Sequence, residues 1–191
     1  MGLTGGLGAG KSTALEALAG LGVAVLSTDA VVHELYGSPE MRDAVTGRWG
    51  PEMVGDGQVD RSAVAERVFA SQDDREWLES TLWPQVAERV ASWRDRVGAQ
   101  SPPPRLAVVE VPLLFESGMD AAFDATIAVV ADERVRAERA GGRGHAAVDG
   151  RAARQLSQGE KAQRATYTVT NDGTPDQLRA ELSAIIDRLD T

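Results

Sequence analysis

The sequence lacks cysteine and is poor in histidine, and both shortages exclude particular kinds of chemistry. Without cysteine the chain has no disulfide, no thiolate nucleophile and no Cys-ligated zinc. Its two histidines, His33 and His145, do not have the H-x₃-H spacing of a metal site, so no zinc centre is predicted. A cysteine-free chain of enzyme size fits the reducing cytosol.

Long apolar runs and an excess of positive charge are also missing. The longest apolar stretch, residues 106–115, contains a Glu and a Pro and is too short to cross a bilayer. The formal net charge of −9 disfavours binding to nucleic acid or to an anionic membrane. A glycine-rich motif begins at Gly5 and leaves no room for a signal peptide, so we expect a cytoplasmic protein.

Short apolar runs alternate with helical patterns along the 191 residues. A chain of this length is expected to form one domain, because domains typically contain roughly 100–200 residues. The predicted strands are Met1–Thr4, Val23–Leu26, Leu106–Val111, Ala125–Ala131 and Thr166–Thr170. The predicted helices are Lys11–Ala19, Asp29–Tyr36, Arg61–Ala70, Asp73–Val97 with an interruption at Pro84, Glu133–Ala140 and Pro175–Leu189, the last with a capping box at Thr174 and Gln177.

Apolar strands separated by helices are typical of a parallel sheet that is buried on both faces. The predicted fold is therefore α/β, a doubly wound parallel sheet. In such folds the ligand binds at the carboxyl ends of the strands. We expect the residues that follow each strand to form the site.

The segment from Gly5 to Ser12 matches the pattern G-x-x-x-x-G-K-[ST] in full, between a predicted strand and a predicted helix. Glycines let such a loop wrap its backbone N–H groups around phosphates, and the positive end of the next helix adds to the attraction. Lys11 is expected to reach the β- and γ-phosphates, and the Ser12 hydroxyl to bind Mg²⁺. The dinucleotide pattern G-x-G-x-x-G is not met. The predicted ATP-binding residues of this loop are Gly6, Leu7, Gly8, Ala9, Gly10, Lys11, Ser12 and Thr13.

An acidic residue, Asp29, follows the second predicted strand. No guanine-reading N-K-x-D pattern occurs, so a small-molecule kinase is favoured over a GTPase. The Asp29 carboxylate would lie at the carboxyl edge of the sheet and could accept the proton of an acceptor hydroxyl or orient it for in-line attack. Alternatively, Asp29 caps the following helix, for which Ser27 and Thr28 are competing caps.

A segment with six arginines and several glycines runs from Arg134 to Arg154, a composition that suits a hinged lid. Lid arginines can spread positive charge over the γ-phosphoryl group, and closure excludes water. Arg139 and Arg143 are the candidates for this role. The other four are expected to be solvated or paired with nearby acids, namely Arg134, Arg136, Arg151 and Arg154.

Glu110 lies near the end of the third predicted strand, a common place for ligands of Mg²⁺-bound water in P-loop folds. It either holds the hydration shell of the metal or pairs structurally with a lysine or arginine. The sequence alone favours neither interpretation.

Four segments, taken in order, resemble the dephospho-CoA kinase family: Gly5–Thr13, Ser27–Asp29, Val111–Glu116 and Asn171. The resemblance covers nearly the whole chain, and the run Pro112–Glu116 is more specific than the P-loop. It implies ATP-dependent phosphorylation of the ribose 3′-hydroxyl of dephospho-CoA, with Mg²⁺. The partners are then two small molecules, ATP and dephospho-CoA, with no nucleic acid and no membrane.

The resemblance also implies a layout and residue roles. A nucleotide core would contain residues 1–36 and 105–191, a helical acceptor region residues 37–104, and a lid residues 139–154. By position, Asp29 would lie beside the acceptor hydroxyl, Arg139 and Arg143 would be lid arginines, and Asn171 would contact the ATP base region. The predicted acceptor-binding residues are Asp29, His33, Trp83 and Leu113.

Three departures from the family pattern lie on the acceptor side. The family usually reads Asp-Ala-Asp with an arginine four residues on, whereas this chain has Ser27-Thr28-Asp29 and His33. Trp83-Pro84 replaces the usual His-Pro, and we hypothesise that Trp83 stacks on the adenine or pantetheine arm of the acceptor. The alternatives are therefore a P-loop kinase for another small hydroxyl acceptor, or a non-catalytic ATP-binding protein.

Overall fold

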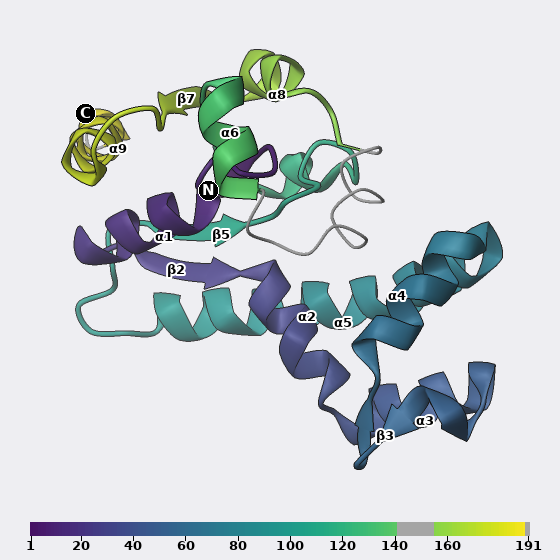
Figure 1. Cartoon of the computed structure of the whole chain (residues 1–191). Helices are drawn as coiled ribbons and strands as arrows, with labels where there is room; N and C mark the ends of the chain where they lie inside the picture. Colours follow the sequence, from purple (N-terminus) through teal and green to yellow (C-terminus); the bar gives the residue numbers. More distant parts are fainter. Residues whose placement is uncertain (141–154, 190–191) are drawn as a thin grey trace. The chain divides into compact units, whose positions relative to one another are not determined.

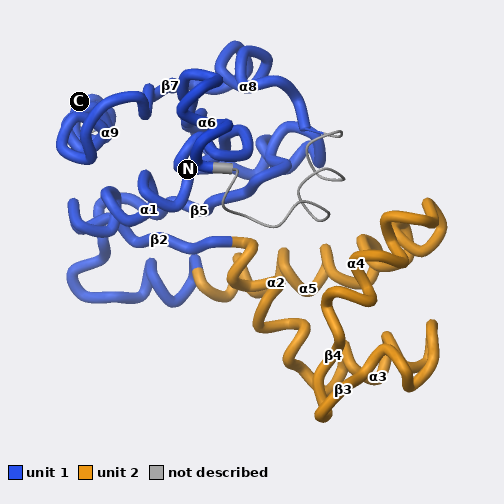
Figure 2. The backbone as a smooth tube through the Cα atoms, viewed as in Figure 1, with its two compact units in different colours: residues 1–27, 94–191 blue, residues 28–93 orange. Residues whose placement is uncertain are grey.

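The computed structural model describes residues 1–140 and 155–189 (Figure 1). The chain divides into two compact units, coloured separately in Figure 2. Unit 1 contains Met1–Ser27 and Arg94–Thr191, and unit 2 contains Thr28–Trp93. Arg143 and most of the predicted lid lie outside the described residues. Within the described ranges, no helix combines the length and apolarity needed to span a bilayer.

Unit 1 is built on a sheet of five strands in the order β2-β5-β1-β6-β7, and every pair is parallel. The strands are β1 (Gly2–Gly5), β2 (Ala24–Ser27), β5 (Ala107–Glu110), β6 (Thr126–Val130) and β7 (Tyr167–Thr170). The predicted doubly wound parallel sheet is confirmed. Strands β2 and β5 lie on one side of β1, and the later strands β6 and β7 lie on the other. The strand order therefore reverses at β1, and such sheets bind ligands at this switch point.

One face of this sheet carries the main apolar core of unit 1. Helices α1 (Lys11–Gly20) and α9 (Pro175–Leu189) pack together against it. Reciprocal bonds between Thr174 and Gln177 begin α9, at 2.8 and 3.3 Å, as the predicted capping box requires. Each fully buried leucine contributes about 1.5–3 kcal/mol of burial free energy. The core includes Leu3, Leu18, Val108, Ile127, Val129, Val169, Leu178, Leu182 and Ile185.

Helix α8 (Gln158–Arg164) was not predicted from the sequence. It begins at a capping box in which Ser157 and Glu160 exchange hydrogen bonds, a signal that the pattern Ser-x-x-Glu displays. Its contacts are with β6 and β1. At seven residues it is too short for a clear apolar period. Helix α6 (Glu133–Ala140) also belongs to unit 1. It begins three residues after β6 and has the predicted bounds.

Unit 2 is mainly helical. Its elements are α2 (Thr28–Tyr36), α3 (Pro39–Trp49), η1 (Pro51–Met53), the short strands β3 (Val54–Gly55) and β4 (Gln58–Val59), α4 (Arg61–Ala70) and the unit's part of α5 (Gln72–Gly98). Helix α3 was missed, although Ser38 caps it and Pro39 stands at its first position. Helix α4 has the predicted bounds.

The prediction that Pro84 interrupts the long helix is wrong, because α5 continues through it. Proline lacks the N–H that would donate to the Ser80 carbonyl one turn earlier, so α5 loses one backbone bond at an exposed position. The Gln85 side chain donates to the Thr81 carbonyl at 2.9 Å, and Thr81 donates its hydroxyl to the Trp77 carbonyl at 2.8 Å. Pro84 itself is exposed, so its ring faces solvent.

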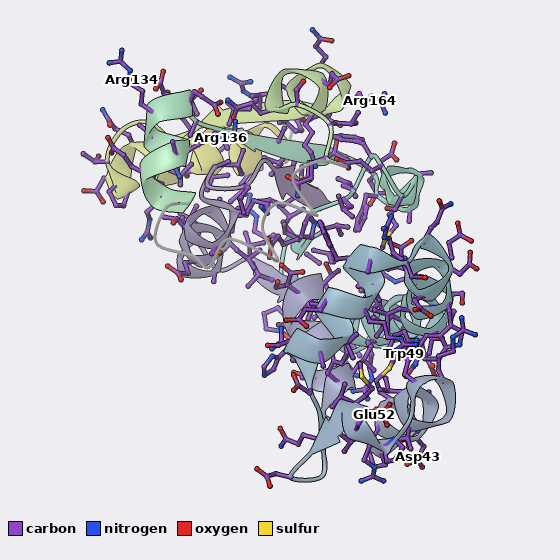
Figure 3. The ribbon with its side chains drawn as sticks, turned by 45° about the vertical axis from the view of Figure 1, so that its right-hand side comes forward. Asp43, Trp49, Glu52, Arg134, Arg136 and Arg164 are labelled. Carbon is purple, nitrogen blue, oxygen red and sulfur yellow. The ribbon has the colours of Figure 1, made fainter. Side chains whose placement is uncertain are left out.

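Asp74 organises the packing of α3 and α4 on α5 in unit 2. Its carboxylate accepts a hydrogen bond from Trp49 Nε1 at 2.9 Å and pairs with Arg48 and Arg67 at 3.2 and 3.3 Å. Trp49, labelled in Figure 3, meets Trp77 edge to face with ring centroids 4.8 Å apart. The hydrogen bond from Trp49, helped by the two arginines, holds the pKa of Asp74 below its ordinary value.

Candidate active site

The loop between β1 and α1 has the conformation expected of a phosphate-binding loop. Gly8 and Gly10 have positive φ angles of 75° and 89°, which only glycine adopts freely. Gly10 is the N-cap of α1 and offers no side chain, and the first turn of α1 holds no acidic residue. The N–H groups at the start of α1 are therefore directed at an anion without competition from a carboxylate.

Lys11 lies back along this loop. Its Nζ donates to the carbonyls of Gly5 at 3.2 Å and Gly6 at 3.3 Å. Ser12 is exposed and Thr13 half-buried in the first turn of α1. The structure thus brings together the lysine and the hydroxyl that the sequence predicted, next to the loop that would hold the phosphates.

Asn171 supports the loop from β7. Its backbone N–H donates to the Val130 carbonyl at 2.8 Å, and its buried Nδ2 donates to the Ala9 carbonyl at 2.9 Å. A side chain at Gly10 would collide with this amide, so the glycine is required on two grounds. The contact of Asn171 with the ATP base region stays a prediction.

Two arginines of α6 reach the same loop region. Arg139 donates from Nη1 to the Asn171 carbonyl at 3.0 Å. Arg136 donates from Nε to the Leu7 carbonyl at 2.9 Å and from Nη1 to Glu133 at 2.7 Å. The prediction that Arg136 pairs with a nearby acid is confirmed, but its contact with the loop was missed. Arg134, on the same helix, is exposed and is labelled with Arg136 in Figure 3.

Local spacing could not reveal the bond from Arg136, since 129 positions separate it from Leu7. The available signal was its place just after the strand β6, beside the carboxyl edge of the sheet. The backbone of Arg136 also approaches Gly8 so closely that a Cβ there would clash with its carbonyl oxygen. Helix α6 is therefore docked on the loop by both backbone and side chain.

Glu110 is buried at the end of β5, in register with Ser27 of β2. Ser27 donates its hydroxyl to Glu110 Oε2 at 2.6 Å. This bond involves a serine rather than the lysine or arginine considered from the sequence. A carboxylate at this edge fits the oxygen chemistry that Mg²⁺ prefers, so a role toward a metal-bound water stays open. Among the residues placed by the structure, no cluster of three or more His, Cys, Asp or Glu side chains could hold a metal.

The predicted acceptor-binding residues are divided between the units. Asp29, His33 and Trp83 belong to unit 2, and Leu113 belongs to unit 1. Helix α2 begins at Thr28, so Asp29 stands within its first turn as an exposed acid rather than at the N-cap. Trp83 and Leu113 are each half-buried.

His33 has an arginine partner that the sequence did not suggest. Arg61 Nη1 lies 2.6 Å from His33 Nδ1, and its guanidinium also lies 5.8 Å from the centre of the Tyr36 ring. Because a guanidinium only donates, Nδ1 accepts and the ring N–H is on Nε2. A guanidinium therefore lies beside the position where the resembled family has arginine.

Comparison with known proteins covers both units. The family model described as dephospho-CoA kinase matches residues 1–177. A dephospho-CoA kinase of Chromobacterium violaceum is 40% identical over 96% of this chain and 91% of its own length. The dephospho-CoA kinase of Rhodopseudomonas palustris is 34% identical over 98% of this chain and 94% of its own length.

Solved structures extend the likeness to the fold. The crystal structure of TT1252 from Thermus thermophilus matches with a TM-score of 0.81 and 32% identity, covering 98% of this chain and 96% of the other. A shikimate kinase of Acinetobacter baumannii matches with a TM-score of 0.51 and 14% identity, over 98% of this chain and 90% of the other, and this similarity concerns the fold alone. The match over residues 1–177 and the full-length relatives show that this chain belongs to the dephospho-CoA kinase family.

Proposed function

We propose that this chain transfers the γ-phosphoryl group of ATP to the 3′-hydroxyl of dephospho-CoA, giving coenzyme A and ADP. The observation that carries the proposal is the complete phosphate-binding loop, braced by Asn171 and Arg136, in a chain of the dephospho-CoA kinase family. Phosphoryl transfer depends mainly on positioning and electrostatics, so a rigid loop with fixed charges is what the reaction needs.

On the donor side, the loop N–H groups and the start of α1 would bind the phosphates of ATP. Lys11 would leave the carbonyls of Gly5 and Gly6 and contact the β- and γ-phosphates. ATP would arrive as its Mg²⁺ complex, with the Ser12 hydroxyl as the protein ligand and Glu110 acting through water. Arg139, already beside Asn171 and the loop, would add positive charge near the transferred group.

On the acceptor side, Asp29 would take the proton from the attacking 3′-hydroxyl. The hydroxyl oxygen forms a bond to the γ-phosphorus, the bond from that phosphorus to the ADP oxygen breaks, and the proton passes to the Asp29 carboxylate. Its place in the chain supports this role, because Asp29 follows the carboxyl end of β2 by two residues. The carboxylate is exposed, as a group that meets a diffusing substrate must be.

The rest of the acceptor would contact two residues that differ from the family pattern, His33 and Trp83, together with Arg61 and Leu113. We infer that the pair of His33 and Arg61 offers donors to the acceptor phosphates, since guanidinium groups bind phosphate in a fork geometry. Trp83 and Leu113 would provide apolar surface for the adenine or the pantetheine arm.

The test is ADP release from Mg·ATP in the presence and absence of dephospho-CoA, with the mass of the product measured. Turnover that depends on dephospho-CoA, with a product of the mass of coenzyme A, supports the proposal. ATP binding without transfer to dephospho-CoA contradicts it. A panel of other small hydroxyl compounds then separates a different acceptor from a non-catalytic ATP-binding protein.

A further inference from the structure

Lys161 is a completely buried lysine outside the phosphate-binding loop. Of the 20 basic residues in the chain, only Lys11 and Lys161 are lysines. The Lys161 side chain is 0% exposed, at the fourth position of α8. Burial lowers its pKa from the ordinary value, while the nearby Glu116 carboxylate raises it. A buried ammonium is costly in free energy unless every proton finds an acceptor.

Each proton of the Lys161 ammonium has an acceptor, and the three acceptors lie in two other segments of unit 1, at Thr4 and at Pro112–Glu116. Nζ donates to Glu116 Oε1 at 2.9 Å, to the Pro112 carbonyl at 2.6 Å and to Thr4 Oγ1 at 3.3 Å. The Thr4 hydroxyl in turn donates to the Pro112 carbonyl at 3.2 Å. Four groups from three distant segments are thus joined around one nitrogen. We call Thr4, Pro112, Glu116 and Lys161 the lysine tie.

Glu116 also connects the lysine tie to Leu156, which lies two residues before the start of α8. Its Oε1 also accepts the backbone N–H of Leu156 at 2.8 Å. Its Oε2 is buried and has no hydrogen-bond partner. At the start of α8, Gln158 separately exchanges two hydrogen bonds with the backbone of Ala131, at 2.8 and 3.1 Å. Helix α8 is thus attached at several points, including a hydrogen bond from the Thr168 hydroxyl of β7 to the Ala162 carbonyl at 3.4 Å. The attachment through Gln158 does not involve Lys161.

The segments that the tie joins are the ones that carry the two substrates under the proposed function. Thr4 is the residue before Gly5, where the phosphate-binding loop starts. Pro112 begins the segment that contains Leu113, a predicted acceptor contact. A backbone bond from Val111 to the Leu3 carbonyl, at 2.8 Å, links the same two segments one residue earlier.

A buried ion pair is weak support for a stabilising role, because apolar residues of similar volume often stabilise a fold equally well or better. An ammonium with three acceptors, in contrast, fixes the distances between them, which an apolar contact does not. A displacement of about 1 Å in a reacting group can reduce a rate about 10²-fold.

We propose that Lys161 and Glu116 are positioning residues that hold the Thr4 end of β1 and the Pro112 segment in the register needed for phosphoryl transfer. The kinetic part of this inference rests on the proposed function. The tie acts on the turnover number rather than on ATP affinity, because the loop itself is held separately by Asn171 and Arg136.

The central variant is the double substitution Lys161→Met and Glu116→Leu, which fills the space with apolar side chains. We expect it to fold with a Tm close to that of the parent chain and to bind ATP within about threefold. Its kcat should fall by about tenfold or more. Thr4→Val, a gentler change that removes one hydroxyl from the tie, should lower kcat in the same direction by a smaller factor.

The matched control is Gln158→Leu, which weakens an attachment of the same helix that does not involve Lys161. It should lower kcat by less than twofold. A double variant with parental kcat would overturn the proposal, since the pair would then serve stability alone. Equal losses in Gln158→Leu and the double variant would also overturn it, because general loosening of α8 would explain both.

A second readout does not depend on the substrate. Amide hydrogen exchange should be at least tenfold faster at Val111 and Ser117 in the double variant, because both donate within the tied segments, to Leu3 and Leu113. Exchange in α9 should not change. Unchanged exchange at Val111 and Ser117 contradicts the tie even if the acceptor proves to be another compound. Failure of the proposed function would instead appear in the parent chain, as absence of turnover with dephospho-CoA.

Discussion

The donor side and the acceptor side of this kinase are built in different ways. On the donor side, the phosphate-binding loop is held by bonds from β7 and α6 to the carbonyls of Ala9 and Leu7. On the proposed acceptor side, His33, Arg61 and Asp29 are exposed side chains on helices of unit 2. The donor side is thus fixed by buried and half-buried bonds within unit 1, whereas the proposed acceptor groups lie at the surface.

The difference explains where the chain matches its family and where it departs. A residue in the loop region is constrained by packing as well as by ATP, as the clash expected for any side chain at Gly10 illustrates. A surface residue such as His33 is constrained only by its ligand and its neighbours. In this chain His33 stands where the family pattern has arginine. The replacement is therefore tolerable, because Arg61 supplies a guanidinium beside His33.

The largest effect is expected from Lys11 on the donor side. Lys11→Ala should lower kcat roughly 10²–10³-fold, the cost of about 3–4 kcal/mol for losing a preorganised donor to the transition state. The fold should persist, because Lys11 is only half-buried and its removal opens no core cavity. Steady-state ADP release and circular dichroism check both statements. A variant that keeps most of its kcat would rule out this role for the loop lysine.

The second effect concerns the acceptor side. Asp29→Asn should lower kcat by about 10²-fold, at the lower end of what general bases contribute, with the KM for ATP unchanged. Asparagine has nearly the same shape, so the substitution tests the proton acceptor rather than the helix. If Asp29 only supports the first turn of α2, the variant will lose stability in thermal unfolding and keep its kcat.

The accuracy of the sequence-based predictions depends on how far apart in the sequence the interacting residues lie. The conformation of the loop from Gly5 to Ser12 followed from a local pattern, and the five strands were predicted within one residue because each is a short run of apolar or β-branched side chains between polar segments. Pro84 misled the prediction of α5, since the helix continues through this exposed proline at the loss of one backbone hydrogen bond.

The contacts that complete the donor side could not be predicted from local patterns. Arg136 and Lys161 act through partners 129 and 157 positions away, at Leu7 and Thr4. Such contacts depend on strand order, which brings β6 and α8 next to β1. The rarity of lysine in this sequence was the one available hint for Lys161.

Arg136 provides a test of the bracing on the donor side. Arg136→Gln should raise the KM for ATP about tenfold, because a hydrogen bond to a charged group contributes about 1.5–3 kcal/mol. The kcat and the KM for the acceptor should change little. Arg134→Gln is the matched control, since Arg134 lies on the same helix but is exposed to solvent. Equal effects in both variants would mean that only the net charge of α6 matters.

Trp83 provides the corresponding test on the acceptor side. Trp83→Ala should raise the KM for dephospho-CoA about fivefold, near the lower limit for an aromatic stacking contact. Trp83→Phe keeps an aromatic face and should recover most of the affinity. The KM for ATP is the internal comparison and should stay constant. An unchanged KM for dephospho-CoA in Trp83→Ala would leave Trp83 as a packing residue of α5.

The smallest effect concerns the stability of unit 2, which contains the proposed acceptor residues Asp29, His33 and Trp83. Bonds from Trp49 and from two arginines hold the pKa of Asp74 below its ordinary value of 3.8. The carboxylate therefore stabilises the fold fully above pH 3.8, and this contribution is lost as the pH falls through the lower pKa of the folded state. Asp74→Asn should lower Tm by a few degrees at pH 7 and by less at pH 3, as thermal unfolding would measure. If the difference in Tm is the same at both pH values, the charge of Asp74 does not hold α3 and α4 on α5.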